Sequence, residues 1–252
     1  MMTIAGFTLI EALRSRVLRL ALLVAFLGFL FSLFLQQIAI TESRQIQSGA
    51  LAVTARLGGV FVIVSFAVSG MLREYQEKGL EFFLAMAIGR TRYFFGKLMG
   101  YAACSLMLSV LLCLPMLWSN AVEPVLIWGI SLFLELLLMS SVSLFFSITL
   151  VQLPAALVAV SGFYLLSRSM GTLMLIMNGP LSDHGLLQSI TDGMISVIGF
   201  LLPSLDEFTK TAWLVYPAES NWRELFPVFL QTVIYLMLMS SAALFDFQRR
   251  EI

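Results

Sequence analysis

The chain has 252 residues, of which 60% are hydrophobic and only 12% are charged, and its mean hydropathy is +0.95. Soluble domains are about 45–50% apolar and about 25% charged, so this composition excludes an ordinary soluble fold. Fifteen basic residues balance fifteen acidic ones, so no net positive field exists to attract nucleic acid. An integral membrane protein with no nucleic-acid partner is therefore expected, with the lipid bilayer as its surroundings.

The first segment, residues 1–17, is expected to be a helix in the cytoplasmic interface that runs into the first span. Two opposite helical faces carry apolar and polar residues, Leu9, Ile10, Leu13 and Val17 on one and Thr8, Glu11, Ser15 and Arg19 on the other. A frayed start of the first span is the alternative. No small-residue cleavage site follows the first apolar run, which indicates a retained helix and not a signal peptide.

Six apolar segments are long enough to cross a bilayer core of about 30 Å, which needs about 20 residues per helix. They are residues 18–36, 54–72, 98–118, 125–149, 155–177 and 226–246. The expected fold is therefore an all-α integral membrane protein with six transmembrane helices in a single domain, 1–252. Ten Lys and Arg residues lie on the side that holds both termini and four on the other, so the positive-inside rule places both termini in the cytoplasm.

The loop 73–97 is expected to contain a short amphipathic helix on the cytoplasmic side. Apolar residues recur there at helical spacing while Glu77 and Glu81 take the opposite face, the apolar set being Leu80, Phe83, Leu84 and Ala87. A basic cluster, Arg90, Arg92 and Lys97, follows. Arg and Lys that merely anchor the third span are the alternative, but the acids favour a protein partner on that side.

The long segment 178–225 lies outside the membrane or re-enters it. Its apolar piece Met194–Leu202 is too short to span, which favours a re-entrant hairpin over a small extracytoplasmic helical cap. Ser204 and Glu207 have capping-box spacing and predict a helix through about Val215. Asn221 and Glu224 repeat that spacing at the start of the sixth span.

Neither catalytic nor metal-binding residues are found in the sequence. The sole histidine, His184, excludes a zinc-protease motif, and Gly89 to Lys97 fails the spacing of a phosphate-binding loop. The methionines at 170, 174 and 177 favour apolar packing over copper ligation. The two cysteines, Cys104 and Cys113, are about 13 Å apart along one helix and are expected to be free thiols.

Two ionisable residues, Glu135 and Arg168, lie deep inside predicted spans, where a charge is costly enough to indicate function. Counting about 1.5 Å per residue from the span ends, their depths differ by only about 5 Å. We therefore expect an intramembrane polar pair between two antiparallel helices. It either fixes helix register or belongs to a substrate path.

The stretch from Arg73 to Arg90, REYQEKGLEFFLAMAIGR, resembles the segment after the second span in ABC-2 type transporter permeases. The opening of the chain, with Glu11, Arg14 and Arg16, is similar to the same family, as is Gly96-Lys97 before the third span. Small six-span permeases of nitrous-oxide reductase maturation and gliding motility are the nearest in kind. Leu80 stands where the family usually has Thr, and Ala87 where Pro is common.

This resemblance implies a half-transporter in a bacterial cytoplasmic (inner) membrane, paired with a second permease as a homodimer or heterodimer. It also implies ABC ATPase subunits that bind the ATP, so the chain itself would be no enzyme and hold no cofactor. The coupling helix would lie around Gly79–Ile88, and the outer segment would form re-entrant helices. The residues implied in ATPase coupling are Glu74, Glu77, Gly79, Glu81, Phe83, Leu84 and Arg90.

The function expected on this basis is ATP-driven export of a substrate that the sequence does not identify. Two alternatives remain. A scaffold would pass ATP-driven motion to another protein, and a secondary transporter would use Glu135 and Arg168 as an ion relay. Internal repeats, which would favour the secondary transporter, are not evident in the sequence.

Overall fold

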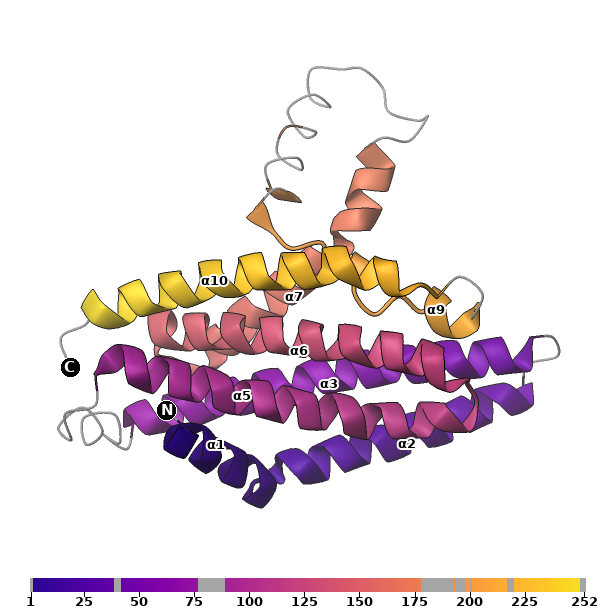
Figure 1. Cartoon of the computed structure of the whole chain (residues 1–252), viewed down its shortest axis with the longest axis horizontal. Helices are drawn as coiled ribbons and strands as arrows, with labels where there is room; N and C mark the ends of the chain where they lie inside the picture. Colours follow the sequence, from indigo (N-terminus) through magenta and orange to yellow (C-terminus); the bar gives the residue numbers. More distant parts are fainter. Residues whose placement is uncertain are drawn as a thin grey trace.

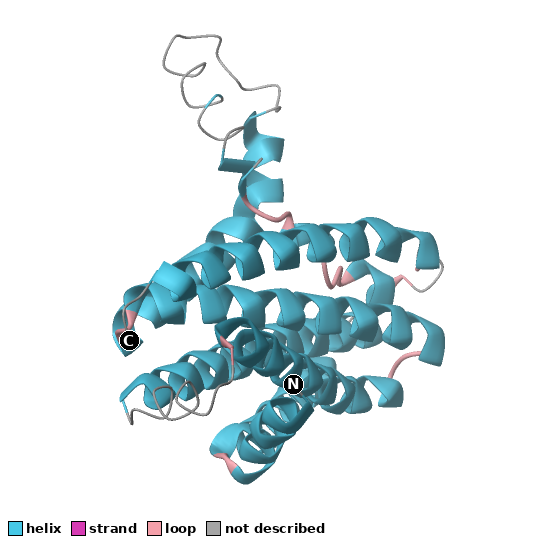
Figure 2. Ribbon diagram, turned by 60° about the vertical axis from the view of Figure 1, so that its left-hand side comes forward, coloured by secondary structure: helices cyan, strands magenta, loops and turns pink. Residues whose placement is uncertain are grey.

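The computed structural model describes residues 2–38, 42–76, 89–177, 193, 198–199, 201–216 and 220–249. Over these residues the chain is helical and contains no strand (Figure 2). Six of its helices are long and apolar enough to cross a membrane. The predicted multi-pass, all-α architecture is confirmed.

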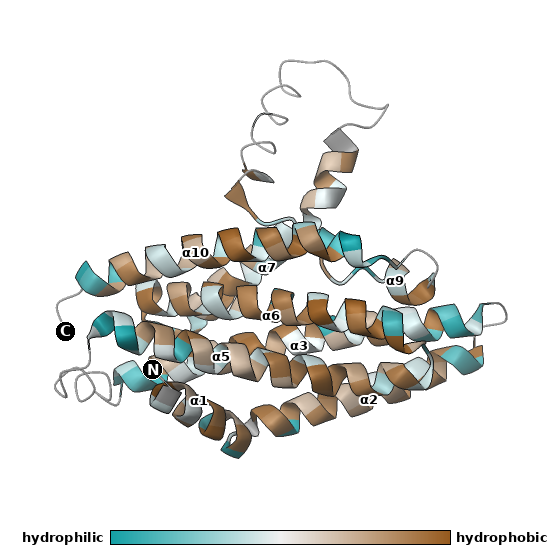
Figure 3. Ribbon diagram, in the orientation of Figure 1, coloured by the Kyte–Doolittle hydropathy of each residue, from teal (hydrophilic) through white to brown (hydrophobic). Residues whose placement is uncertain are grey.

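The six long helices are α2 (Arg16–Ile38), α3 (Ser43–Gln76), α5 (Arg90–Cys113), α6 (Val122–Leu150), α7 (Leu153–Met177) and α10 (Leu225–Arg249). Five of the six contain a whole predicted span, and α5 contains residues 98–113 of the third span. A short 3-10 turn, η1 (Leu114–Trp118), extends α5, with Pro115 near its start because proline fits the first turn of a helix. The helices run along the long axis of the molecule (Figure 1), and hydrophilic residues gather toward the ends of the bundle (Figure 3).

Both termini lie at one end of the bundle, together with the end of α3 and the start of α5 (Figure 1). The connection from α2 to α3, the turn η1 and α9 (Ala212–Val215) lie at the other end. We call these the terminal end and the distal end.

Helix α6 forms the centre of the bundle. In its most apolar stretch 78% of the residues are buried, against 22% in α2 at the periphery. It packs against α3, α5, α7 and α10. Helix α7 is tilted relative to its neighbours, and its last turns leave the side of the bundle (Figure 1). Side chains on α6 are therefore the ones most completely withdrawn from the surroundings.

Two segments between predicted spans are helical over part of their length. Between the first two predicted spans, α3 already begins at Ser43. Ser48, near its start, donates a hydrogen bond to Asn120 at 2.8 Å. Of the predicted loop 73–97, residues 73–76 belong to α3 and residues 90–97 to α5. The basic residues predicted as a loop cluster therefore lie on the first turns of α5.

The first helix, α1 (Met2–Arg14), packs on α5 through a face that includes Ile4 and Thr8. Thr8 is 1% exposed, while Ile10 and Leu13 are about half exposed. A Cβ atom on Gly100 would lie 2.6 Å from the Cβ of Thr8, so only glycine permits this approach. Of the apolar face predicted for residues 1–17, Ile10 and Leu13 are thus exposed, while Val17 is buried and Leu9 packs against the core.

Replacing Gly100 with alanine should therefore push α1 away from α5. Overpacking of a well-packed contact costs about 1–3 kcal/mol, so we expect a lower midpoint of thermal unfolding in detergent micelles. Gly162→Ala is the matched control, because a Cβ there meets no atom within 4 Å. Equal midpoints for the two variants would contradict the close contact.

Candidate functional site

A buried polar cluster lies where α3, α6 and α7 meet the segment between α7 and α10. Its members all carry hydrogen-bonding groups and contact one another directly or through a shared neighbour: Arg56, Ser131, Glu135, Tyr164, Arg168 and Thr209. Thr209 follows the 3-10 turn η2 (Leu205–Glu207). The other members lie on the long helices, so this cluster joins a connecting segment to the core of the bundle.

Glu135 is the centre of the buried polar cluster and is fully buried. It lies about 20 Å from either end of α6, at about 1.5 Å per residue. Its carboxylate accepts a hydrogen bond of 2.7 Å from the hydroxyl of Thr209 and one of 3.2 Å from that of Tyr164. Buried carboxylates need such partners, because an unpaired one costs several kcal/mol.

Arg168 lies beside Glu135, with a guanidinium nitrogen 4.0 Å from the carboxylate. Its hydrogen bonds go elsewhere, to the backbone carbonyls of Leu205 and, at 3.0 Å, Phe208. The structure therefore brings the two predicted residues together, but as a loose ion pair. The stronger contacts of both residues are with the turn at 205–209.

The turn at 205–209 is held in the bundle by contacts from three helices. Thr209 is fully buried and has φ 43°, and its amide donates to Ser131 at 2.9 Å. Arg56 donates to the carbonyl of Thr209 at 3.4 Å. Irregular backbone at membrane depth is tolerated only when its polar groups are satisfied by protein or water, and these contacts meet that need.

These contacts correct the prediction of one helix from Ser204 to Val215. The chain instead forms η2, a turn at Phe208 to Lys210, and the short helix α9. Ser204 makes no side-chain cap. The left-handed backbone of Thr209 interrupts the helix, because its amide and hydroxyl bond to α6 instead. Asn221 does cap the turn before α10, accepting from the amide of Arg223 at 3.0 Å.

Several members of the buried polar cluster were not predicted from the sequence. Arg56 stands near the start of the predicted span 54–72, but it lies thirteen residues inside α3, about 20 Å from its start. A longer second helix would have placed it at membrane depth. Ser131, Tyr164 and Thr209 gave no such signal, since single hydroxyls are common in apolar helices.

A second group of charges lies at the terminal end, and we call it the terminal charge cluster. Glu74 at the end of α3 accepts from Tyr93 and from Lys97, which is only 4% exposed. Arg90 donates to the carbonyls of Phe247 and Gln248 at 3.0 Å each, at the end of α10. These carbonyls carry the negative end of the helix dipole, which favours a cation there.

Two of the residues predicted for ATPase coupling, Glu74 and Arg90, thus belong to the terminal charge cluster. The others, Glu77, Gly79, Glu81, Phe83 and Leu84, lie outside the described residues. A further pair, Arg73 and Glu11, joins α3 to α1. The segment 77–88 is therefore flanked on both sides by side chains bound to other helices.

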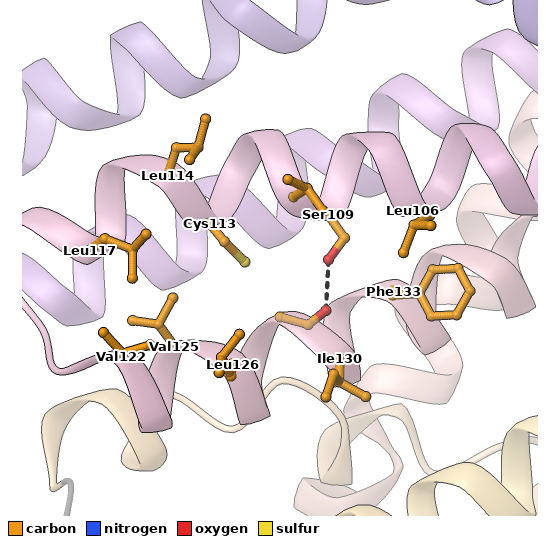
Figure 4. Close-up of a pocket in the computed structure, with 12 residues that line it drawn as sticks. Leu106, Ser109, Cys113, Leu114, Leu117, Val122, Val125, Leu126, Ile130 and Phe133 are labelled. Atoms are coloured by element: carbon orange, nitrogen blue, oxygen red, sulfur yellow. Dashed lines mark hydrogen bonds between the residues drawn. The ribbon is translucent and has the colours of Figure 1, made fainter.

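An apolar groove between α5 and α6 has a volume of about 280 Å³ (Figure 4). The sulfur of Cys113 faces it, and the hydroxyl of Ser109 is bound to the carbonyl of Gly129 at 2.6 Å. Its lining residues include no charged group, so it offers no means of recognising a polar ligand.

Metal chemistry has no support in the described part of the chain, where no three His, Cys, Asp or Glu side chains lie together. Both cysteines are free thiols, as expected. Neither a protein-family model nor a curated protein matches the sequence. The functional assignment therefore depends on the sequence resemblance and on the geometry above.

Proposed function

We propose that the chain is the transmembrane permease subunit of an ABC transporter, which couples ATP hydrolysis by separate ATPase subunits to export of a substrate. The observation that carries this proposal is the terminal charge cluster. On the two sides of the segment 77–88, the nearest described charged residue of each long helix binds another helix, Glu74 of α3 binding α5 and Arg90 of α5 binding α10. A force on the segment would therefore reach several helices at once.

The proposed coupling route begins at residues 77–88, where Glu77 and Glu81 would meet an ATPase. On one side, Glu74 is bound to Tyr93 and Lys97 of α5. On the other, Arg90 binds the end of α10. Buried charge pairs resist separation, because parting them leaves an unpaired charge. The helices α3, α5 and α10 would then move as one unit.

A route for cargo is supported by two hollows along the exposed face of α3. One, of about 390 Å³, lies beside Glu11 and Arg73, and the other, of about 360 Å³, lies between α3 and α7. Ser65 lines both, and Tyr164 of the buried polar cluster lines the second. This face would lead from the terminal end toward the centre of the bundle and would be completed by a second permease.

The rival ion relay through Glu135 and Arg168 has less support. Both side chains are engaged with the turn at 205–209, which gives them a role in holding that turn. A scaffold that moves another protein would use the same coupling segment as an exporter. Transport of cargo by reconstituted vesicles distinguishes the two.

The experiment that tests the proposal is coexpression with an ABC ATPase of the same organism, followed by copurification and measurement of ATP turnover. The wild-type chain should form a complex, and Glu77→Lys with Glu81→Lys should reduce both copurification and turnover at least tenfold. Reversing two charges at a protein interface costs several kcal/mol, and each 1.4 kcal/mol is a factor of about ten.

The matched control is Glu42→Lys with Glu123→Lys, which reverses two exposed acids at the distal end. It should copurify and hydrolyse ATP as the wild type does. Failure of the wild type to bind any ATPase, or equal losses in both double variants, would refute the coupling role of residues 77–88.

A further inference from the structure

A polar hollow and an apolar groove meet at Trp118 on the distal half of the bundle. The hollow has a volume of about 160 Å³ and lies between α2, α3 and η1. The groove has a volume of about 370 Å³ and runs between α2 and the end of α5. Trp118 lines both, so the hollow and the groove adjoin at this side chain.

The polar hollow presents groups that bind a phosphate. Its lining residues, apart from Trp118, are all polar, and they are Gln36, Arg44, Gln47 and Ser119. Gln47 is only 2% exposed, so its amide is held in place by packing. Arg44 lies in the first turn of α3 and takes part in none of the ion pairs between described residues. A guanidinium beside amide and hydroxyl donors at a helix start favours an anion.

The apolar groove has the form that an acyl chain requires. Its α2 side is the stripe Leu22, Ala25, Phe26 and Phe29, and its other side is Leu111 of α5 with Leu114 and Pro115 of η1, both sets at helical spacing. From Gln36 to Leu22 the distance along α2 is about 21 Å. A leaflet contributes about 15 Å of a hydrocarbon core of about 30 Å, so this length fits one tail and its head group.

Trp118 marks the junction at the depth where a head group meets its tails. Its side chain is 80% exposed, so the bundle does not use it for packing. Tryptophan is enriched at this level of the bilayer, because its ring is apolar and its N–H is polar. The groove between α5 and α6 is a contrast, since its lining holds no charged residue (Figure 4).

We propose that this surface binds one phospholipid of the distal leaflet, with its phosphate against Arg44 and Gln47 and one acyl chain along α2 and α5. Charge complementarity selects the phosphate, and the joined groove selects a lipid over a free anion. The site is separate from the terminal charge cluster and the buried polar cluster. It does not depend on the proposed transport function.

The test is retention of lipid by the purified full-length chain in detergent, counted by native mass spectrometry. Three probes share parts of one molecule: phosphatidylglycerol, diacylglycerol with the same chains, and glycerol phosphate. We expect one phosphatidylglycerol to be retained, and neither of the two fragments at the same concentration. Arg44→Gln and Trp118→Ala should each weaken retention about tenfold, which is about 1.4 kcal/mol.

The matched control is Arg223→Gln, which removes an exposed positive charge from the same end of the bundle. It should retain phosphatidylglycerol as the wild type does. Equal retention by Arg44→Gln and Arg223→Gln would refute the phosphate site. If diacylglycerol were retained as well as phosphatidylglycerol, the surface would be only an apolar groove. If glycerol phosphate bound as well as phosphatidylglycerol, it would be only an anion site. Either result would overturn the proposal. Both test positions are exposed, and an unchanged elution profile verifies folding.

Discussion

Replacing Glu135 with leucine should lower the free energy of unfolding by about 3–5 kcal/mol, because it removes the acceptor at the centre of the buried polar cluster. Thr209 and Tyr164 would lose their bonds to the carboxylate, and Arg168 would lose its neighbouring charge. Glu135→Gln keeps an oxygen acceptor in place, so it should cost less, about 1–3 kcal/mol. Unfolding by titration with a denaturing detergent measures both.

A cysteine at position 205 tests whether Glu135 holds the turn at 205–209 in place, apart from any general effect on stability. Leu205 is fully buried, so a thiol there reports on exposure of the turn. With Cys104 and Cys113 replaced by serine, Leu205→Cys should react slowly with a thiol reagent when Glu135 is present. Adding Glu135→Leu should release the turn at 205–209 and speed the reaction at least tenfold. The control is Glu123→Gln, an exposed acid at the start of the same helix. If both substitutions at Glu135 behaved like this control, the carboxylate would not hold the turn.

Composition and helical spacing predicted the parts of this fold that depend on the bilayer. A long apolar run must be a helix at membrane depth, because the backbone finds no other hydrogen-bond partner there. The same depth reasoning predicted that Glu135 and Arg168 lie close, and they are 4.0 Å apart. Helix lengths were underestimated, since Ser43 to Val53 and Arg90 to Lys97 are polar enough to read as loops yet remain helical.

The contacts that depend on tertiary packing were not predictable. The capping-box spacing of Ser204 and Glu207 favours a helix locally, but Thr209 breaks it by bonding to Ser131 and Glu135 on α6. Its partners lie more than 70 residues away along the chain. Local propensity is a weak prior that tertiary contacts override. The polar hollow at Arg44 likewise combines residues from separate elements of the fold, so no local sequence pattern predicted it.

Reversing the charge of either Glu74 or Lys97 should destabilise the terminal end by about 3 kcal/mol or more. Either change places two like charges together at a site where the side chain of residue 97 is only 4% exposed. Tyr93 would also lose its carboxylate acceptor in Glu74→Lys. Exchanging the two residues, Glu74→Lys with Lys97→Glu, should recover much of the loss, since the opposite charges meet again. Thermal unfolding of the three variants gives the coupling energy directly.

The pair of Arg73 and Glu11 is the matched control, because its side chains are 54% and 26% exposed. Surface pairs contribute about 0–1 kcal/mol, so single reversals there should change stability little. If the proposed coupling route is correct, ATP turnover with the partner ATPase should fall in Glu74→Lys and return in the exchanged variant. Recovery of stability without recovery of turnover would assign the Glu74–Lys97 pair to folding alone. The motion of residues 77–88 would then have to reach the bundle through Arg90 and α10.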